Sequence, residues 1–105
     1  MVEIELPFSP EMQKAALEGR KTCTSRNSQK GEVGDTFKIK TTTFRLTRVD
    51  QRSLVYVAYM LHDMEGFVCS QSFIDYYDSL YKKRGGSGYV PEKLVWVHWF
   101  KRVMA

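Results

Sequence analysis

The segment 94–103 constrains the fold more than any other part of the sequence. It is rich in β-branched and aromatic residues, and Val95, Trp96 and Val97 at its centre are all apolar. Apolar side chains at consecutive positions of a strand point to both faces of its sheet, as expected of a strand buried on both sides. We therefore predict that residues 94–103 form the central strand of a sheet.

Capping signals predict a helix near the N-terminus. Ser9, Pro10 and Glu11 are the residue types preferred at the N-cap, at the first helical position and in the first turn. An apolar stripe follows, and Gly19 stands where a residue in the left-handed conformation commonly ends a helix. We predict a helix of about three turns that ends at Gly19.

Three further strands are predicted from alternation and β propensity. Residues 2–6 alternate apolar and acidic side chains, which is the period of a half-buried strand. Residues 37–40 alternate apolar side chains with lysine, and residues 44–49 are rich in aromatic and β-branched side chains. We predict that the last two strands are joined by the threonines 41–43.

Residues 54–64 fit two structures. As a strand they would form a continuous apolar run that contains two tyrosines. As a helix they place apolar residues at the spacing i, i+3, i+4 and i+7, with Ser53 as a possible N-cap. The helical pattern matches more positions, so we predict a helix that ends near Gly66. A further helix is predicted from an N-cap at Ser70 to the basic residues 82–84.

The order of these elements predicts a small α+β fold. The 105 residues, of which 43% are hydrophobic, suffice for a single domain over residues 1–105 with its own core. No stretch approaches the ~20 consecutive apolar residues of a membrane-spanning helix. Residues 1–5 lack the basic and apolar regions of a secretion signal. We therefore expect a cytoplasmic protein with no membrane partner.

The cysteine and histidine residues do not indicate a metal or disulfide site. Cys23 and Cys69 are too few for a disulfide framework, and His62 and His98 have no partner at metal-ligand spacing. We expect no cofactor, and we interpret Cys23 as a small buried residue rather than a nucleophile. The net charge of +4 is a modest excess that is compatible with an anionic partner such as RNA.

Residues 19–27 concentrate reactive side chains where the chain leaves a helix for an extended segment. Such junctions often carry chemistry, because a rigid element fixes the geometry while the loop stays accessible. Structural roles suit the same residues. Lys21 would complement the dipole at a helix C-terminus, and Thr22 and Thr24 would suit ordinary strand positions. Glu65 would suit a solvated helix end.

The run 19–26 has Gly, Arg, Lys and Thr at its first four positions, then Thr24 and Arg26, and is followed by Gly34-Asp35 before a strand. This pattern resembles the ASCH domain of the PUA-like superfamily. The resemblance continues through Glu65-Gly66-Phe67 to the terminal strand and covers nearly the whole chain. It implies a curled β-sheet or pseudo-barrel flanked by short helices, a groove lined by the motif, and an association with RNA or modified nucleosides.

Within that family the motif is most similar to the small bacterial N4-acetylcytidine amidohydrolases. The similarity implies an amidohydrolase acting on N4-acetylcytidine or a related modified nucleoside, with Lys21, Thr24 and Glu65 as catalytic residues. Thr24 would be the nucleophile, Lys21 its base, and Glu65 the acid or the group that orients the lysine. Cys23 and Ser25 stand where the family has hydrophobic residues.

The hypothesis assigns substrate or RNA binding to Arg20, Thr22 and Arg26. In a flat strand Thr22 and Arg26 share one face with Thr24, whereas Lys21 points to the other face. The catalytic hypothesis therefore requires a bend between Lys21 and Thr24.

Two alternatives to an enzyme stay open. The first is a non-catalytic RNA-binding module, or a weak ribonuclease, that uses the same basic groove, with residues 82–84 also contacting phosphates. Tyr76, Tyr77, Trp96 and Trp99 are expected to lie mostly in the core, although an exposed one would stack on a base. The second is a small protein-interaction domain, for which the sequence offers no positive feature.

Overall fold

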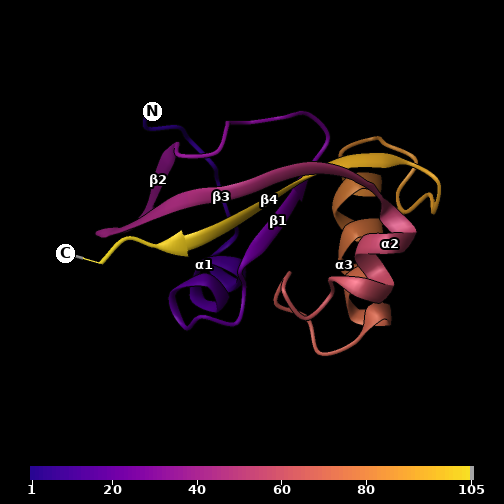
Figure 1. Ribbon diagram of the computed structural model, residues 1–105. Coiled ribbons are helices and arrows are strands. Elements are labelled where there is room, and N and C mark those ends of the chain that lie inside the picture. The colour runs from indigo at the N-terminus through magenta and orange to yellow at the C-terminus, as the bar shows by residue number, and fades with distance from the viewer. Residues whose placement is uncertain (105) are drawn as a thin grey trace.

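The computed structural model describes residues 1–104. Its centre is a four-stranded antiparallel sheet with the strand order β1-β4-β3-β2. The strands are β1 (Cys23–Arg26), β2 (Thr36–Ile39), β3 (Thr42–Ser53) and β4 (Leu94–Arg102). Because β4 lies between β1 and β3, the prediction of a central strand near the C-terminus is confirmed (Figure 1).

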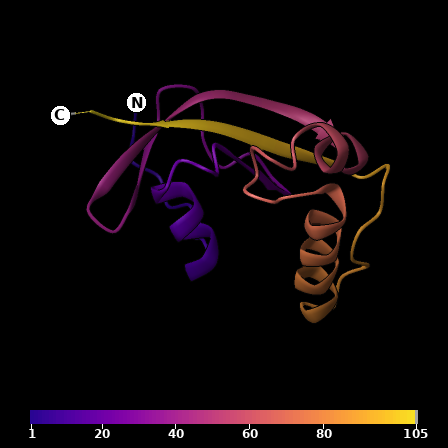
Figure 2. The same cartoon turned by 90° about the horizontal axis from the view of Figure 1, so that it is seen from below.

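The described residues also form three helices: α1 (Pro10–Leu17), α2 (Leu54–Met60) and α3 (Ser70–Lys83). The long strands β3 and β4 curve into an arch, and α1 and α3 lie beneath the two ends of that arch (Figure 2). A curled antiparallel sheet with short flanking helices is the α+β fold that the sequence predicted. None of the helices among residues 1–104 is long and apolar enough to span a membrane.

The predicted caps explain where α1 and α2 begin. The Ser9 hydroxyl accepts a hydrogen bond from the Met12 amide at 3.3 Å, with Pro10 at the first helical position. The Ser53 hydroxyl accepts one from the Tyr56 amide at 3.3 Å in the same way. The helical interpretation of the apolar run after Ser53 is thus confirmed, although α2 ends at Met60 and a series of turns extends to Gly66.

The start of α3 was predicted one residue too late. Cys69 occupies the N-cap position and forms no capping hydrogen bond, and Ser70 is already helical. The Cys69 thiol instead contacts the Ser72 hydroxyl at 3.2 Å. A serine near a helix start is a good signal of the start, but it does not by itself distinguish the cap from the first turn.

Residues 2–6 form no continuous strand, so that prediction is wrong. Their only pairing among the described residues is an isolated parallel bridge between Glu3 and Thr36. The Val2 amide is bound instead by the Asp35 carboxylate at 3.0 Å. The Leu6 side chain is buried in the hydrophobic core.

The hairpin of β2 and β3 is tighter and longer than predicted. The register pairs Ile39 with Thr42, which leaves a two-residue turn in which Lys40 adopts a φ of 56°. The predicted 41–43 connection is therefore wrong by two residues, because threonine favours the strand. β3 runs on to Ser53 through a β-bulge between Leu46 and Arg48.

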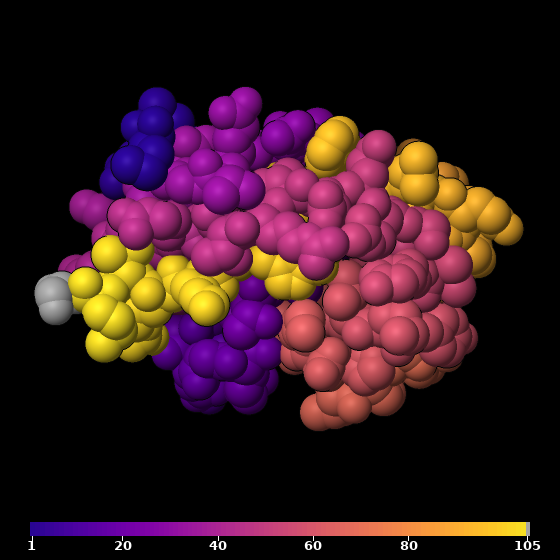
Figure 3. All heavy atoms as spheres, in the orientation of Figure 1, coloured from indigo at the N-terminus to yellow at the C-terminus, as the bar shows by residue number. Residues whose placement is uncertain are grey.

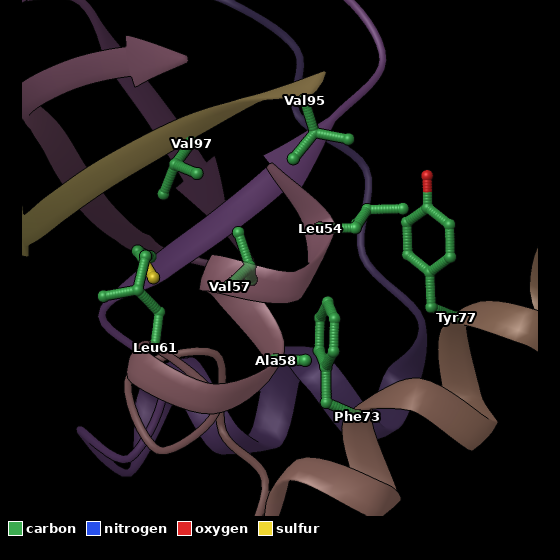
Figure 4. Packing of buried hydrophobic residues seen from close by; sticks show 9 residues of the cluster. Leu54, Val57, Ala58, Leu61, Phe73, Tyr77, Val95 and Val97 are labelled. Carbon is green, nitrogen blue, oxygen red and sulfur yellow. The ribbon is translucent and has the colours of Figure 1, made fainter. Parts of the chain in front are cut away.

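Two hydrophobic clusters hold the two halves of the arch. The first packs α2 and α3 against β1 and β4, where Val95 and Val97 face Val57 and Phe73 (Figure 4). The second packs α1 and the N-terminal segment against the sheet around three phenylalanines, Phe37, Phe44 and Phe100. Each cluster fixes one helical wall, and the short strand β1 lies between the two walls.

Candidate functional site

A cavity of about 640 Å³ lies between these walls. Its lining comes from the N-terminal segment and α1 on one side, from β1 and the residues that follow it, from the turn after α2, and from α3 on the other side. The volume falls in the range of pockets that bind small organic molecules. The cavity therefore suits a ligand of nucleoside or nucleotide size.

Lys21 and Glu65 form a buried ion pair at this cavity. The Lys21 Nζ atom lies 3.0 Å from Glu65 Oε1 and donates a second hydrogen bond to the Glu65 backbone carbonyl at 2.9 Å. Each residue is only 3% exposed. A charged pair is costly to bury unless it is well bonded, so this contact fixes the position of both side chains.

The backbone explains how residues so distant in sequence meet. Gly19 has a φ of +81° and ends α1, after which the Lys21 amide bonds the Ala15 carbonyl at 3.1 Å. The next two amides, of Thr22 and Cys23, both donate to the Met64 carbonyl. The exit from α1 is therefore joined to the turn after α2, and these two segments meet below the sheet (Figure 3).

Thr24 is a buried residue that lines the same cavity. It lies in β1 opposite His98 of β4 and is 4% exposed. β1 begins only at Cys23, so Lys21 precedes the regular strand and is not bound by its alternation of faces. Because the chain is not a flat strand between these two residues, Lys21 and Thr24 can both line the cavity. The catalytic hypothesis required a bend of this kind.

Ser25 completes the contacts of the carboxylate and was not among the predicted site residues. Its hydroxyl donates to Glu65 Oε2 at 2.5 Å, so the two carboxylate oxygens have different partners, Ser25 and Lys21. Ser25 lies within the stretch 19–27 that the sequence analysis singled out. In a flat strand, however, its side chain would point to the face opposite Thr24. Nothing local in the sequence indicates that Glu65 approaches at this edge of β1.

Of the three residues that the sequence analysis assigned to substrate or RNA binding, Arg26 lines the cavity. One of its terminal nitrogens donates to the Pro7 carbonyl at 2.8 Å, and its guanidinium lies 5.0 Å from the centre of the Phe8 ring. Burial lowers the pKa of Arg26 below its usual value, although the nearby carboxylate of Glu65 opposes this shift. Arg20 and Thr22, by contrast, are exposed and do not line the cavity, and Arg20 pairs with Glu18 at 2.7 Å.

Aromatic rings form much of the cavity wall. The sequence left open which aromatic residues would be accessible to a base. Tyr76 and Tyr77 line the cavity, whereas Trp96 and Trp99 do not. The full aromatic lining is Phe8, Phe67, Phe73, Tyr76, Tyr77 and Tyr81.

Cys23 and His98 have structural surroundings. Cys23 is fully buried in the α2–α3 cluster, and burial strongly raises the pKa of its thiol. His98 is also fully buried and accepts a hydrogen bond from the Lys30 amide at 3.0 Å. Among residues 1–104 no three His, Cys, Asp or Glu side chains are grouped so that they could hold a metal ion.

Comparison by sequence finds no relative. No family model matches the chain. No curated protein matches it either.

Comparison by structure finds several similar folds. The ASCH domain from Lactobacillus crispatus aligns with a TM-score of 0.70 at 12% identity, over 96% of this chain and 79% of that one. A protein of Enterococcus faecalis assigned to the DUF984 family aligns with a TM-score of 0.65 at 18% identity, over 97% and 75% of the two chains. A third structure, of a hypothetical protein, aligns with a TM-score of 0.65 at 12% identity, over 97% of this chain and 98% of that one. The chain therefore has the fold of the ASCH domain, as the motif predicted.

Proposed function

We propose that the protein is an amidohydrolase that removes the acyl group from N4-acetylcytidine or a closely related N-acylated nucleoside. One observation carries this proposal: a buried lysine–glutamate pair, Lys21 and Glu65, lines the same small-molecule cavity as the Thr24 hydroxyl. The motif resemblance suggested these three residues, and the contact between the first two supports it.

The ion pair offers a route to a neutral lysine. A lysine acts as a base only in its unprotonated form, which is rare for an exposed side chain with a pKa near 10.4. If the Lys21 ammonium passes a proton to the Glu65 carboxylate 3.0 Å away, the net charge of the buried pair does not change. The neutral amine is then available to the Thr24 hydroxyl without leaving an uncompensated charge in the interior.

The reaction proceeds in two stages. In the first, Thr24 Oγ attacks the acyl carbonyl carbon and its proton moves to Lys21 Nζ. The tetrahedral intermediate then collapses, Lys21 returns the proton to the departing N4 nitrogen, and cytidine leaves with the acetyl group bound to Thr24 as an ester. In the second, water attacks that ester with Lys21 again accepting the proton, which releases acetate and restores the Thr24 hydroxyl.

The aromatic walls suit the planar part of the substrate. Bases removed from a nucleic acid helix are commonly held by stacking on aromatic side chains or on arginine guanidinium planes. Phe8 with its stacked Arg26 lies on one side of the cavity, and the tyrosines of α3 lie on the other. A pyrimidine ring between these walls would direct its exocyclic amide toward the buried polar residues.

Incubation of the purified protein with N4-acetylcytidine, following loss of the acetyl group, tests the proposal. We expect turnover by the wild type and a loss of about 10²-fold or more for Lys21→Ala and for Thr24→Val, because each removes a group that handles the transferred proton. Lys101→Ala, which removes an exposed lysine of β4, serves as the control and should keep full activity. Equal rates for wild type and Lys21→Ala, or no cleavage by the wild type, would contradict the proposal.

A second candidate function is RNA binding without catalysis through the same cavity. The observation in its favour is that the exposed Lys30 and Arg84 line the cavity and that two more lysines of α3, Lys82 and Lys83, adjoin Arg84. Phosphate contacts of this kind make affinity fall steeply with salt. An affinity for single-stranded RNA that does not change between low and high salt would count against this function.

A further inference from the structure

We propose that the outer part of the cavity is a phosphate subsite formed by Arg26, Lys30 and Arg84, and that the preferred substrate is an N-acylated nucleoside monophosphate rather than the free nucleoside. The phosphate subsite is argued from the charges and contacts of these three residues. The identity of the acylated base rests on the proposed function.

The charges that line the cavity are unbalanced in favour of an anion. Lys21 and Glu65 neutralise each other in their ion pair. The other charged residues of the lining are Arg26, Lys30 and Arg84 against Glu5 alone. Within residues 1–104, no salt bridge neutralises any of the three cations. An anionic ligand would supply the missing counter-charge.

Arg26 has donors that the protein itself does not satisfy. Its Nε atom is buried and forms no hydrogen bond with any residue from 1 to 104. Buried polar groups are nearly always bonded, so the unpaired Nε marks a guanidinium whose hydrogen-bonding capacity the described residues leave unfilled. The Pro7 carbonyl and the Phe8 ring hold the guanidinium in place, so its donor geometry is preorganised. A planar guanidinium with free donors matches the oxygens of a phosphate group.

Arg84 lies on the opposite wall and adds a second guanidinium. It stacks on Tyr81 at 5.7 Å from the ring centre, much as Arg26 stacks on Phe8. Burial is the largest cause that lowers the pKa of Arg26, and repulsion by the positive charge of Arg84 adds to it. A dianionic phosphate between them would convert this repulsion into two attractive contacts.

The depth of the charged residues matches the layout of a nucleotide. Lys21, Thr24 and Glu65 are at most 4% exposed and form the inner end of the cavity. Lys30 and Arg84 also line the cavity but are exposed, and Arg26 is half-buried. A nucleotide whose acylated base points inward would place its phosphate near these exposed cations. The free nucleoside would leave the three cations without a partner.

Calorimetric titration with cytidine, cytidine 5′-monophosphate, cytidine 3′-monophosphate and inorganic phosphate tests the subsite. We expect at least one monophosphate to bind about tenfold or more tightly than cytidine at low salt, because charge-assisted hydrogen bonds to phosphate are added. Arg84→Gln and Lys30→Gln should each reduce this preference severalfold and leave the affinity for cytidine unchanged. Arg45→Gln, an exposed arginine of β3 outside the cavity, is the matched control and should keep the preference.

Three outcomes would overturn the inference. One is equal affinity for cytidine and both monophosphates, or no binding of any of them. Another is a loss of preference in Arg45→Gln as large as that in Arg84→Gln, which would mean a general effect of net charge. The last is a short single-stranded RNA that binds more tightly than either monophosphate, which would assign the cations to an RNA path.

Cleavage assays separate this inference from the proposed function. We expect kcat/KM to be higher for N4-acetylcytidine 5′- or 3′-monophosphate than for N4-acetylcytidine, and the difference to shrink in Arg84→Gln. If no acetylated compound is cleaved but a monophosphate still binds preferentially, the proposed function fails and the subsite stands. If nucleoside and nucleotides are cleaved with equal kcat/KM, the function stands and the subsite fails.

Discussion

At the scale of single residues, the Lys21–Glu65 pair is the contact on which the proposed mechanism rests. Both side chains are almost fully buried, and each supplies the counter-charge of the other. Breaking such a pair from one side leaves a charge in the interior, whereas replacing both partners by apolar groups of similar size is often neutral or stabilising. We therefore expect the pair to contribute little net stability, and the proposed function gives it a chemical role.

This difference gives a test that separates stability from activity. We expect Lys21→Met to lower the free energy of unfolding by about 3 kcal/mol or more, because Glu65 is left unpaired. The double variant Lys21→Met/Glu65→Leu should recover most of that loss in urea denaturation, yet it should remain inactive toward N4-acetylcytidine. A double variant that is as unstable as the single one would contradict this view of the pair, and a double variant that keeps activity would contradict its role in catalysis.

The sequence predicted some of the residues that line the cavity but not all of them. Lys21, Thr24 and Glu65 were selected by the motif, and the structure places all three at one cavity. Ser25 was not selected because its contact with Glu65 spans 40 positions and depends on how the turn after α2 approaches β1. Arg84 was predicted to belong to a basic helix end that contacts phosphates in the RNA-binding alternative, and the packing of α3 brings it into the lining of the cavity.

At the scale of elements, the turn that ends at Gly66 positions the glutamate against the exit from α1. Gly66 has a φ of +99°, and a Cβ atom there would lie 3.3 Å from both Ala15 Cβ and Lys21 Cβ. Gly19 also has a positive φ, but a Cβ atom there would meet nothing within 4 Å. A side chain at Gly19 would therefore meet backbone strain alone, whereas a side chain at Gly66 would meet both backbone strain and crowding by its neighbours.

We expect Gly19→Ala to cost about 1–2 kcal/mol, which is the usual penalty for a side chain in the left-handed region. Gly66→Ala should cost about 1 kcal/mol more than that, because Ala15 and Lys21 must also move. The displaced Lys21 should reduce turnover in the Gly66 variant only. Thermal or urea denaturation of both variants, paired with the cleavage assay, measures these effects, and equal losses in the two variants would show that the turn does not set the site geometry.

Element prediction succeeded where local chemistry determines the structure. The caps Ser9 and Ser53 bond the amides that the capping rules assign to them, so α1 and α2 begin where predicted. Residues 2–6 had the alternation of a strand, but among the described residues they pair with the sheet through an isolated bridge at Glu3, and Leu6 is buried in the core. Tertiary packing of this kind cannot be seen in a five-residue pattern.

At the scale of the whole molecule, one buried imidazole links folding stability to pH. Burial lowers the pKa of His98, whereas a histidine in an unfolded chain has a pKa of about 6.5. Below that pH the unfolded chain binds more protons than the folded protein, so the free energy of unfolding falls as the pH decreases. The loss begins near the unfolded pKa and continues down to the lowered folded pKa.

Urea denaturation between about pH 7.5 and about pH 5.5 measures this dependence. We expect His98→Gln to have a smaller loss of stability over that range than the wild type, because the variant has no imidazole to protonate in the unfolded state. His62→Gln, at a half-buried histidine whose ring nitrogen Nδ1 lies 3.0 Å from the Ala58 carbonyl oxygen, is the matched control. An identical pH dependence in wild type and His98→Gln would contradict this account.

The overall architecture was the most predictable level. Residues 94–103 have apolar side chains on both faces of a strand, which predicts a central position in a sheet. The strand β4 has that position, between β1 and β3. The sequence did not indicate that the arch carries two separate clusters, because that division depends on how far the long strands curl. The cavity lies between the walls that these clusters hold, and β1 contributes Thr24, Ser25 and Arg26 to its lining.

Trapping the acyl intermediate tests the central claim most directly. The wild type is mixed with N4-acetylcytidine, quenched in acid during turnover, digested and examined by peptide mass spectrometry. We expect an acetyl group on Thr24, absent in a sample without substrate and absent in Thr24→Val. An acetyl group on Ser25 or Lys21 instead, or continued turnover by Thr24→Val, would contradict the claim that Thr24 is the nucleophile of this site.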